Sequence, residues 1–231
     1  MSSIDSIINR QLLKWELQRR QAEGQPAPRP KPPPIVTVSR QTGSRGSYFA
    51  ARLAEEMGYQ LLHREIIDTI CETTGYRKRI VESIDNRFRG ELELLVESVF
   101  TGQTIDHTDY FKHLCQMVLS MSQLGGVILM GRGGNFILGA KRGFHLRFVA
   151  PKKQRIGNLV AYRKVTEDEA ARLIEKSDSS RREFVRKIFG ADIDDPHHYD
   201  LVINARYLDV EETLGVVAAA VRAKFDKLTY L

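Results

Sequence analysis

The stretch IVTVSRQTGSRGSYFAARLAEEMG, residues 35–58, decides the fold of this chain. A short β-branched run leads into a turn rich in glycine, serine and arginine, and an alanine-rich helical pattern follows at once. Backbone N–H groups in such a turn, and at the start of the following helix, can point at one anion. The stretch therefore predicts a strand–loop–helix unit that binds a phosphate.

The loop departs from the common phosphate-binding pattern G-x-x-x-x-G-K-[ST]. Arg40 stands at the position of the first glycine and Gly46 at the position of the lysine, whereas Gly43 and the hydroxyl residue Ser47 are retained. Loss of one oriented donor from a transition-state site lowers the rate roughly 10²–10³-fold. An enzyme built on this loop needs another cation, and Arg45 and Arg40 are the nearest. A plain tight turn between strand and helix would have the same sequence.

The composition is that of an ordinary globular protein. Of its residues, 42% are hydrophobic and 28% are charged. A chain of 231 residues is long enough to form one domain with its own core. Cys71 and Cys115 lie far apart without a CxxC pair, which favours reduced thiols and makes a metal site improbable. No apolar run approaches the roughly 18 residues of a membrane span, and no cleavable signal is recognisable. We expect a cytoplasmic protein.

The net charge of +6 is unevenly distributed. Residues 1–34 carry +3 and residues 141–187 carry +8, so the remainder of the chain is net acidic. A basic segment suits a polyanion, either a phosphorylated small molecule or a nucleic acid. Nucleic acid is the weaker choice, because no recognised nucleic-acid motif is present and few aromatic residues interleave with the basic runs. A solvated helical face would carry the same charges.

The N-terminal segment has a character of its own. Ile4, Ile8, Leu12 and Trp15 recur at helical spacing, and six of the eight prolines fall within residues 25–34. Such a proline-rich stretch is extended polyproline II. We therefore expect residues 1–34 to form a helical arm and linker ahead of a domain over residues 35–231. The apolar stripe of the arm must be buried on its own domain or on a second copy, and the second outcome would give a homo-oligomer.

The body of the chain predicts a parallel α/β sheet. Short apolar runs that predict strands lie at residues 35–38, 60–62, 127–130, 144–150 and 201–204. Helical patterns separate them, over residues 49–57, 64–123 (with turn signals near Gly75, Gly90 and Gly102), the two or three helices after Pro151, and 210–227. Alternation of strands and helices is typical of parallel sheets covered on both faces.

A second glycine-rich turn follows the strand of residues 127–130. The sequence there, VILMGRGGN, ends a buried run with Arg132 between glycines. Ligands of doubly wound sheets lie beyond the carboxyl ends of the strands, where an arginine can fork onto a phosphate. An exposed arginine in a simple turn is the other interpretation.

The basic segment of residues 151–190 has the pattern of a lid. Thr166 and Glu169 form a capping box that opens a helix. Asp178 and Arg181 are three residues apart, so they share a helical face and can hold one another in position. A basic lid that closes on phosphates has this pattern, and so does an ordinary surface ion pair.

Taken together, the loop, the glycine–arginine turn, the basic segment and the strand in YDLVIN (residues 199–204) resemble the cytidylate kinase-like family of P-loop kinases over about residues 35–225. The loop SRQTGS, residues 39–44, is similar to a divergent branch of that family that lacks the lysine. The resemblance implies a nucleoside-kinase fold: a five-stranded parallel sheet flanked by helices, a helical monophosphate-binding insertion over 65–125, and a lid over 151–190. It implies transfer of a phosphoryl group from ATP, with Mg²⁺, to a nucleoside monophosphate such as CMP or dCMP. The alternative is a nucleotide-binding regulator with little or no turnover.

The resemblance also assigns roles by position. It implies that the ATP phosphates are bound by Gly43, Ser44, Arg45, Gly46 and Ser47, with Ser47 facing Mg²⁺. It implies catalytic arginines at Arg155 and Arg181, and contacts to the acceptor from Arg132 and Arg64. As the candidate replacements for the lysine, Arg45 is expected to be catalytic and Arg40 to contact the substrate. The sequence departs from the family at Gly133, where the family's G-R-D turn has aspartate, at the missing lysine, and in the insertion.

Overall fold

The structure, a computed structural model, describes residues 3–23, 33–84, 86–100 and 109–227. Within these ranges lies a five-stranded sheet of order β2-β3-β1-β4-β5, and every strand pair is parallel. The strands are β1 (Val36–Arg40), β2 (Gln60–Leu62), β3 (Val127–Met130), β4 (Phe144–Val149) and β5 (Leu201–Asn204). All five predicted strands are confirmed, with shifted ends only at β1 and β4. Because β1 is central, the loop that follows it lies in the middle of the carboxyl edge of the sheet.

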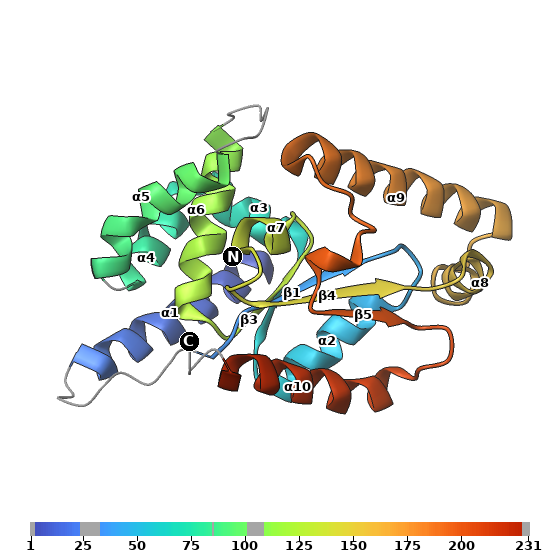
Figure 1. The fold of residues 1–231 in the computed structure, drawn as a ribbon, viewed down its shortest axis with the longest axis horizontal. Coiled ribbons are helices and arrows are strands. Elements are labelled where there is room, and N and C mark those ends of the chain that lie inside the picture. The colour runs from blue at the N-terminus through green and yellow to red at the C-terminus, as the bar shows by residue number, and fades with distance from the viewer. Residues whose placement is uncertain (1–2, 24–32, 85, 101–108, 228–231) are drawn as a thin grey trace.

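Each face of the sheet has its own apolar core. On one face α2 (Gly46–Met57) and α10 (Val210–Lys227) pack on the strands, with Phe49, Leu53 and Val217 fully buried. On the other face lie the helices α1 (Ser3–Glu23), α3 (Arg64–Glu72), α4 (Thr74–Ser83), α5 (Asn86–Phe100), α6 (Asp109–Leu124) and α7 (Gly134–Leu138). Figure 1 shows this helical layer beside the sheet and α10 below it.

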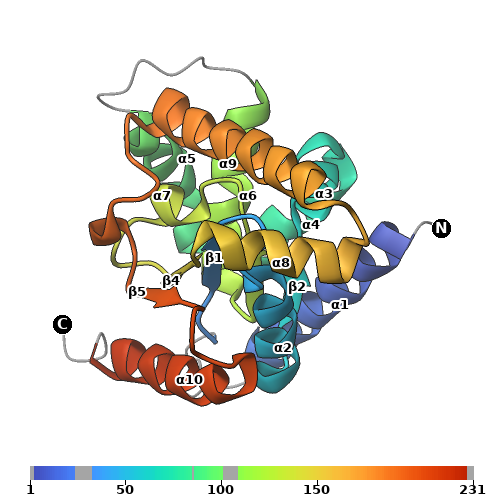
Figure 2. The ribbon, with the colours of Figure 1, turned by 90° about the vertical axis from the view of Figure 1, so that its right-hand side faces the viewer.

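Two helices extend past the carboxyl ends of the strands. They are α8 (Lys152–Arg163) and α9 (Glu167–Phe189), and a 3₁₀ turn, Pro196–His198, leads from them to β5. In Figure 2 α8 crosses in front of the sheet and α9 runs above it. The predicted capping box is present, because Thr166 Oγ1 accepts from the Glu169 amide at 3.2 Å and Glu169 Oε2 accepts from the Thr166 amide at 2.9 Å. The lid-like segment is thus a helical hairpin beside the loop.

The break predicted near Gly75 is present two residues away, at Thr73, whereas the one predicted near Gly90 is displaced. Gly75 lies inside α4 and Gly90 inside α5, and the chain turns instead at Thr73 and between α4 and α5. A Cβ on either glycine would meet no atom within 4 Å, so these glycines are exposed helical positions and not turns. The expected turn at Gly102 and most of the proline-rich linker lie outside the described residues.

Helix α1 buries its apolar stripe on its own domain. Ile8, Leu12 and Trp15 are at most 2% exposed, and the Trp15 indole donates to the Gly125 carbonyl at 3.0 Å. Of the two outcomes that the sequence left open for this stripe, the structure has the intramolecular one. Among the described residues, no helix has both the length and the apolar character that a bilayer span requires.

Candidate functional site

The loop between β1 and α2 has a backbone that restricts which residues it can hold. Gly43 has φ +80°, and a Cβ there would lie 2.5 Å from the carbonyl oxygen of Arg155 on α8. Arg45 has φ +65° directly before α2 begins. Ser44 is buried, and its hydroxyl accepts from the Gly46 amide at 3.4 Å. Among the described residues the amides of Arg45 and Ser47 have no acceptor, so this helix start can receive an anion.

The position of the missing lysine has no room for any side chain. A Cβ on Gly46 would lie 2.8 Å from the Cβ atoms of both Arg40 and Phe148. A cation is nevertheless present beside the loop hydroxyl, because Arg40 Nε donates to Ser47 Oγ at 3.3 Å. Burial, together with the charge of Arg181, lowers the pKa of Arg40 to about 10. Of the two candidate replacements, Arg40 lies at Ser47, whereas the Arg45 guanidinium lies 5.7 Å from the centre of the Tyr48 ring.

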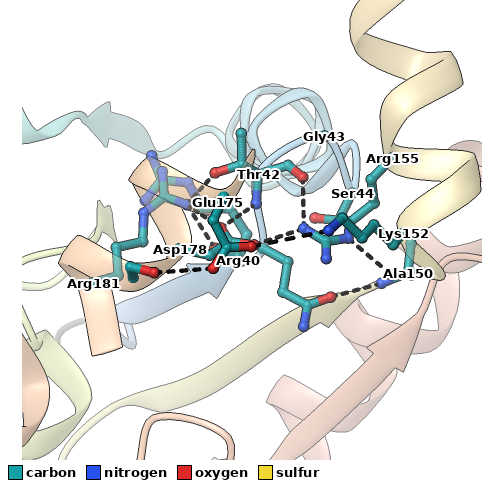
Figure 3. A network of polar contacts seen from close by, with 12 residues as sticks. Arg40, Thr42, Gly43, Ser44, Ala150, Lys152, Arg155, Glu175, Asp178 and Arg181 are labelled. Carbon is teal, nitrogen blue, oxygen red and sulfur yellow. Dashed lines mark hydrogen bonds and ion pairs between the residues drawn. The ribbon is translucent and has the colours of Figure 1, made fainter. Parts of the chain in front are cut away.

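Helix α9 is joined to the loop through two side chains, as Figure 3 shows. Asp178 Oδ1 accepts from the Thr42 amide at 2.9 Å. Arg181 Nη1 donates to Thr42 Oγ1 at 2.6 Å, to the Arg40 carbonyl at 3.3 Å and to Asp178 Oδ1 at 3.1 Å. The predicted pairing of Asp178 with Arg181 is present, and both residues contact the loop between β1 and α2.

Arg155, the third predicted catalytic arginine, contacts the loop from α8. Its guanidinium is buried, and it donates to Asp178 Oδ2 at 2.6 Å, to the Thr42 carbonyl at 3.1 Å and to the Ala150 carbonyl at 3.0 Å. These bonds tie α8 to the outer side of the loop. As placed, Arg155 supports the loop with its Nε and Nη1 donors.

Arg132 and Arg64 meet at a single carboxylate. Arg132 forms a salt bridge with Asp68 on α3 and lies 5.6 Å from the centre of the Tyr110 ring, and Arg64 Nε is 3.6 Å from Asp68 Oδ2. Burial would raise the pKa of Asp68, but hydrogen bonds from Arg132 and Tyr110 outweigh it and hold that pKa below its usual value. The two arginines predicted to bind an acceptor are therefore brought together, against the helical insertion.

The surroundings of Gly133 explain why this turn has glycine where the family pattern has aspartate. Its φ is +67°, and a Cβ there would lie 2.3 Å from Cε2 of Phe189 at the end of α9. Phe189 is itself held in an aromatic group with Phe136, Phe184 and Phe111. An aspartate therefore does not fit beside Arg132 unless this group moves.

One charged residue near the loop was missed by the sequence analysis. Arg147 is buried in β4, and it donates to Ser39 Oγ at 2.7 Å and pairs with Asp194. Burial lowers the pKa of Arg181, and the positive charge of Arg147 adds to that effect. The signal that could have identified it is an arginine inside the otherwise apolar run LRFV, residues 146–149.

No dedicated metal site is evident in the described part of the chain. No group of three or more His, Cys, Asp or Glu side chains there could hold a metal ion. Cys71 and Cys115 are free and buried, and burial raises the pKa of each thiol to about 12. Ser47 is exposed in the first turn of α2, so its hydroxyl suits a Mg²⁺ ion held mainly by phosphate oxygens.

Comparison with known proteins agrees with this geometry. A curated cytidylate kinase of Methanocaldococcus jannaschii is 25% identical over 190 residues, which are 81% of this chain and 97% of that protein. One of Thermoplasma acidophilum is 28% identical over 112 residues, 48% of this chain and 59% of that protein. A crystal structure of an uncharacterized protein from Eubacterium ventriosum shares the fold, with a TM-score of 0.64, 17% identity and coverage of 82% and 98% of the two chains. The profile of the cytidylate kinase-like family matches residues 35–207, and the chain belongs to that family.

Proposed function

We propose that the protein transfers a phosphoryl group from ATP to a nucleoside monophosphate, with CMP or dCMP as the first acceptor to test. The observation that carries the proposal is the contact of Arg181 with Thr42, which brings a cation from α9 onto the phosphate-binding loop across 139 residues of sequence. Phosphoryl transfer depends on positioning and on charge neutralisation, and converging arginines supply both.

In this proposal the donor phosphates bind at the start of α2. The free amides of Arg45 and Ser47 face them, and Arg40 takes the part that a lysine has in other phosphate-binding loops. A magnesium ion bound with the nucleotide would neutralise phosphate charge, and the Ser47 hydroxyl would be its protein ligand. Ser47 Oγ accepts from Arg40 Nε at 3.3 Å, and the second lone pair of the hydroxyl would serve the metal ion.

The acceptor phosphate would bind to Arg132 and Arg64. Both arginines now share Asp68, so a monophosphate has to compete with one carboxylate for two guanidinium groups. A dianionic phosphate can accept forked hydrogen bonds from both, which favours it over the shared carboxylate.

A nucleotide-binding regulator without turnover is the second candidate. Two observations favour it: Gly46 leaves no space for a lysine, and Asp178 occupies the Thr42 amide. Such a protein would bind Mg-ATP and leave it intact.

The deciding experiment follows ADP formation from Mg-ATP with a panel of CMP, dCMP, UMP, AMP and GMP. We expect turnover with CMP or dCMP, and we expect Arg181→Ala to lower kcat/KM by roughly 10²-fold or more because a transition-state cation is lost. Arg172→Ala is the matched control, since Arg172 is an arginine of the same helix that has no part in the contacts with the loop. ATP-dependent thermal stabilisation without turnover of any monophosphate would exclude the kinase and leave the regulator.

A further inference from the structure

A small hollow lies between the carboxyl ends of β1 and β4 and helix α9. Of the described residues that line it, four are arginines (Arg40, Arg147, Arg181 and Arg182) and one is a carboxylate, Asp178. We propose that this hollow is an anion subsite with Arg147 as its fixed floor, and that its ligand is a phosphoryl group of the substrate. The identity of the ligand as substrate rests on the proposed function, whereas the anion site itself does not.

Arg147 is an unusual residue for its position. Its side chain is 4% exposed, on a central strand whose neighbouring positions Leu146 and Phe148 are buried and apolar. The Nε–H of Arg147 is buried and has no hydrogen-bond partner among the described residues. Burying a charge costs several kcal/mol, which an apolar side chain would avoid. A buried arginine at a hollow that three further arginines line is suited to an anionic ligand.

The other contacts of Arg147 hold it in place. Nη1 donates to Ser39 Oγ at the end of β1, Nη2 pairs with Asp194, and the guanidinium lies 5.6 Å from the centre of the Tyr199 ring. These contacts come from two separate segments of the chain, β1 and the connection between α9 and β5. The positive charge is therefore fixed relative to the sheet, whereas Arg181 and Arg182 reach the hollow from α9.

The arginines of the hollow are not fully compensated by carboxylates. Asp178 is shared between Arg155 and Arg181, and Asp194, the partner of Arg147, is partly exposed to solvent. Burial and the charge of Arg181 lower the pKa of Arg40, whereas the charges of Glu65 and Asp178 act in the opposite direction. A bound dianion would offset the positive charge of the arginines.

The size of the hollow limits the ligand. Its free volume of about 210 Å³ includes space open to solvent, and the enclosed part is only about 10 Å³, room for about one water molecule. A whole nucleotide is therefore excluded, and a phosphoryl group would bind at the open side of the hollow. Guanidinium groups match the geometry of phosphate oxygens.

The test is binding of inorganic phosphate and of pyrophosphate to the full chain, measured by calorimetry at constant ionic strength. We expect Arg147→Met to weaken binding roughly tenfold or more, and Arg147→Lys to weaken it less, because hydrogen bonds to charged groups are the strong ones. Arg142→Met is the matched control: it removes the same charge just ahead of the opposite end of β4, and we expect wild-type affinity.

Circular dichroism establishes whether Arg147→Met folds. If it does not, Arg182→Met decides, because Arg182 lines the hollow from α9 and its loss should still weaken binding about threefold. Wild-type affinity in the deciding variant, or an equal loss in Arg142→Met, overturns the proposal. Turnover in the nucleotide panel is a separate readout. Arg147-dependent phosphate binding without turnover would refute the kinase and keep the subsite, and the reverse result would refute the subsite alone.

Discussion

Gly46 shows, at the scale of one residue, how the loop dispenses with a lysine. A Cβ at this position would lie 2.8 Å from the Cβ atoms of Arg40 and Phe148, so the backbone approaches β1 and β4 too closely for a side chain. The sequence showed that a lysine was absent. It could not show that the space was filled, because that depends on Phe148, more than 100 positions away.

Replacement of Gly46 should therefore destabilise the protein. We expect Gly46→Ala to lower the free energy of unfolding by about 1–3 kcal/mol through overpacking. Gly157→Ala is the control, since Gly157 lies in α8 where an added methyl group would meet no atom within 4 Å, and alanine there should stabilise by about 0.5–1 kcal/mol. Urea denaturation of both variants gives the comparison, and equal stability of Gly46→Ala and wild type would contradict the close approach.

The predicted site residues were identified by pattern, but the directions of their side chains were not. Arg181 and Asp178 face the loop as their helical spacing suggested. Arg155 was expected to act on phosphate, yet it bonds to Thr42, Asp178 and Ala150 on three different segments. Such a set of acceptors exists only after folding, so sequence spacing could not reveal it.

At the scale of an element, helix α1 shows that a sequence pattern can predict a helix without predicting the surface on which it packs. Its periodicity predicted the helix and its buried stripe, but an amphipathic pattern does not identify the surface that covers the stripe. In the structure Arg79 of α4 pairs with Glu16, and Tyr76 donates to Asp5, so polar contacts also hold α1 on the body. The helix is part of the core of the helical layer.

Substitution of Trp15 should show how strongly the stability of the protein depends on the docking of α1. We expect Trp15→Ala to destabilise the protein by about 3–5 kcal/mol, because it opens a cavity and leaves the Gly125 carbonyl without its donor. Leu13→Ala, on the exposed side of α1, should change stability by no more than about 0.5 kcal/mol. Chemical denaturation measures both. Equal stability of the two variants would mean that α1 does not dock on the body in solution.

At the scale of the whole molecule, the class of fold could be predicted from the sequence. The side-chain contacts that connect the helical layer to the sheet could not. Short apolar strands alternating with helices were enough for a five-stranded parallel sheet. The break predicted near Gly90 was misplaced, because an exposed glycine is tolerated inside a helix whose packing is made by other positions. The joint between insertion and sheet, where Asp68 meets Arg132 and Tyr110, comes from three distant segments.

The contact of Asp68 with Arg132 and Tyr110 should make the free energy of unfolding depend on pH. The pKa of Asp68 is lower in the folded protein than its usual value of 3.8, so its contribution is fully present above that value and is lost as the pH falls through the folded pKa. We expect Asp68→Asn to be less stable than wild type at pH 6, and the difference to shrink on acidification below about pH 4. Glu72→Gln, an exposed change on the same helix, is the control. A difference that stays constant from about pH 6 to about pH 2.5 would contradict the assignment.

The ring of Phe189 above Gly133 makes these two positions interdependent. An aspartate could enter the turn only after, or together with, a smaller residue at position 189, and that residue would in turn leave a void among the neighbouring rings. An evolutionary path or a protein engineer that moves between the two forms of this turn must therefore make paired changes, and the order in which they are made decides whether the intermediate folds.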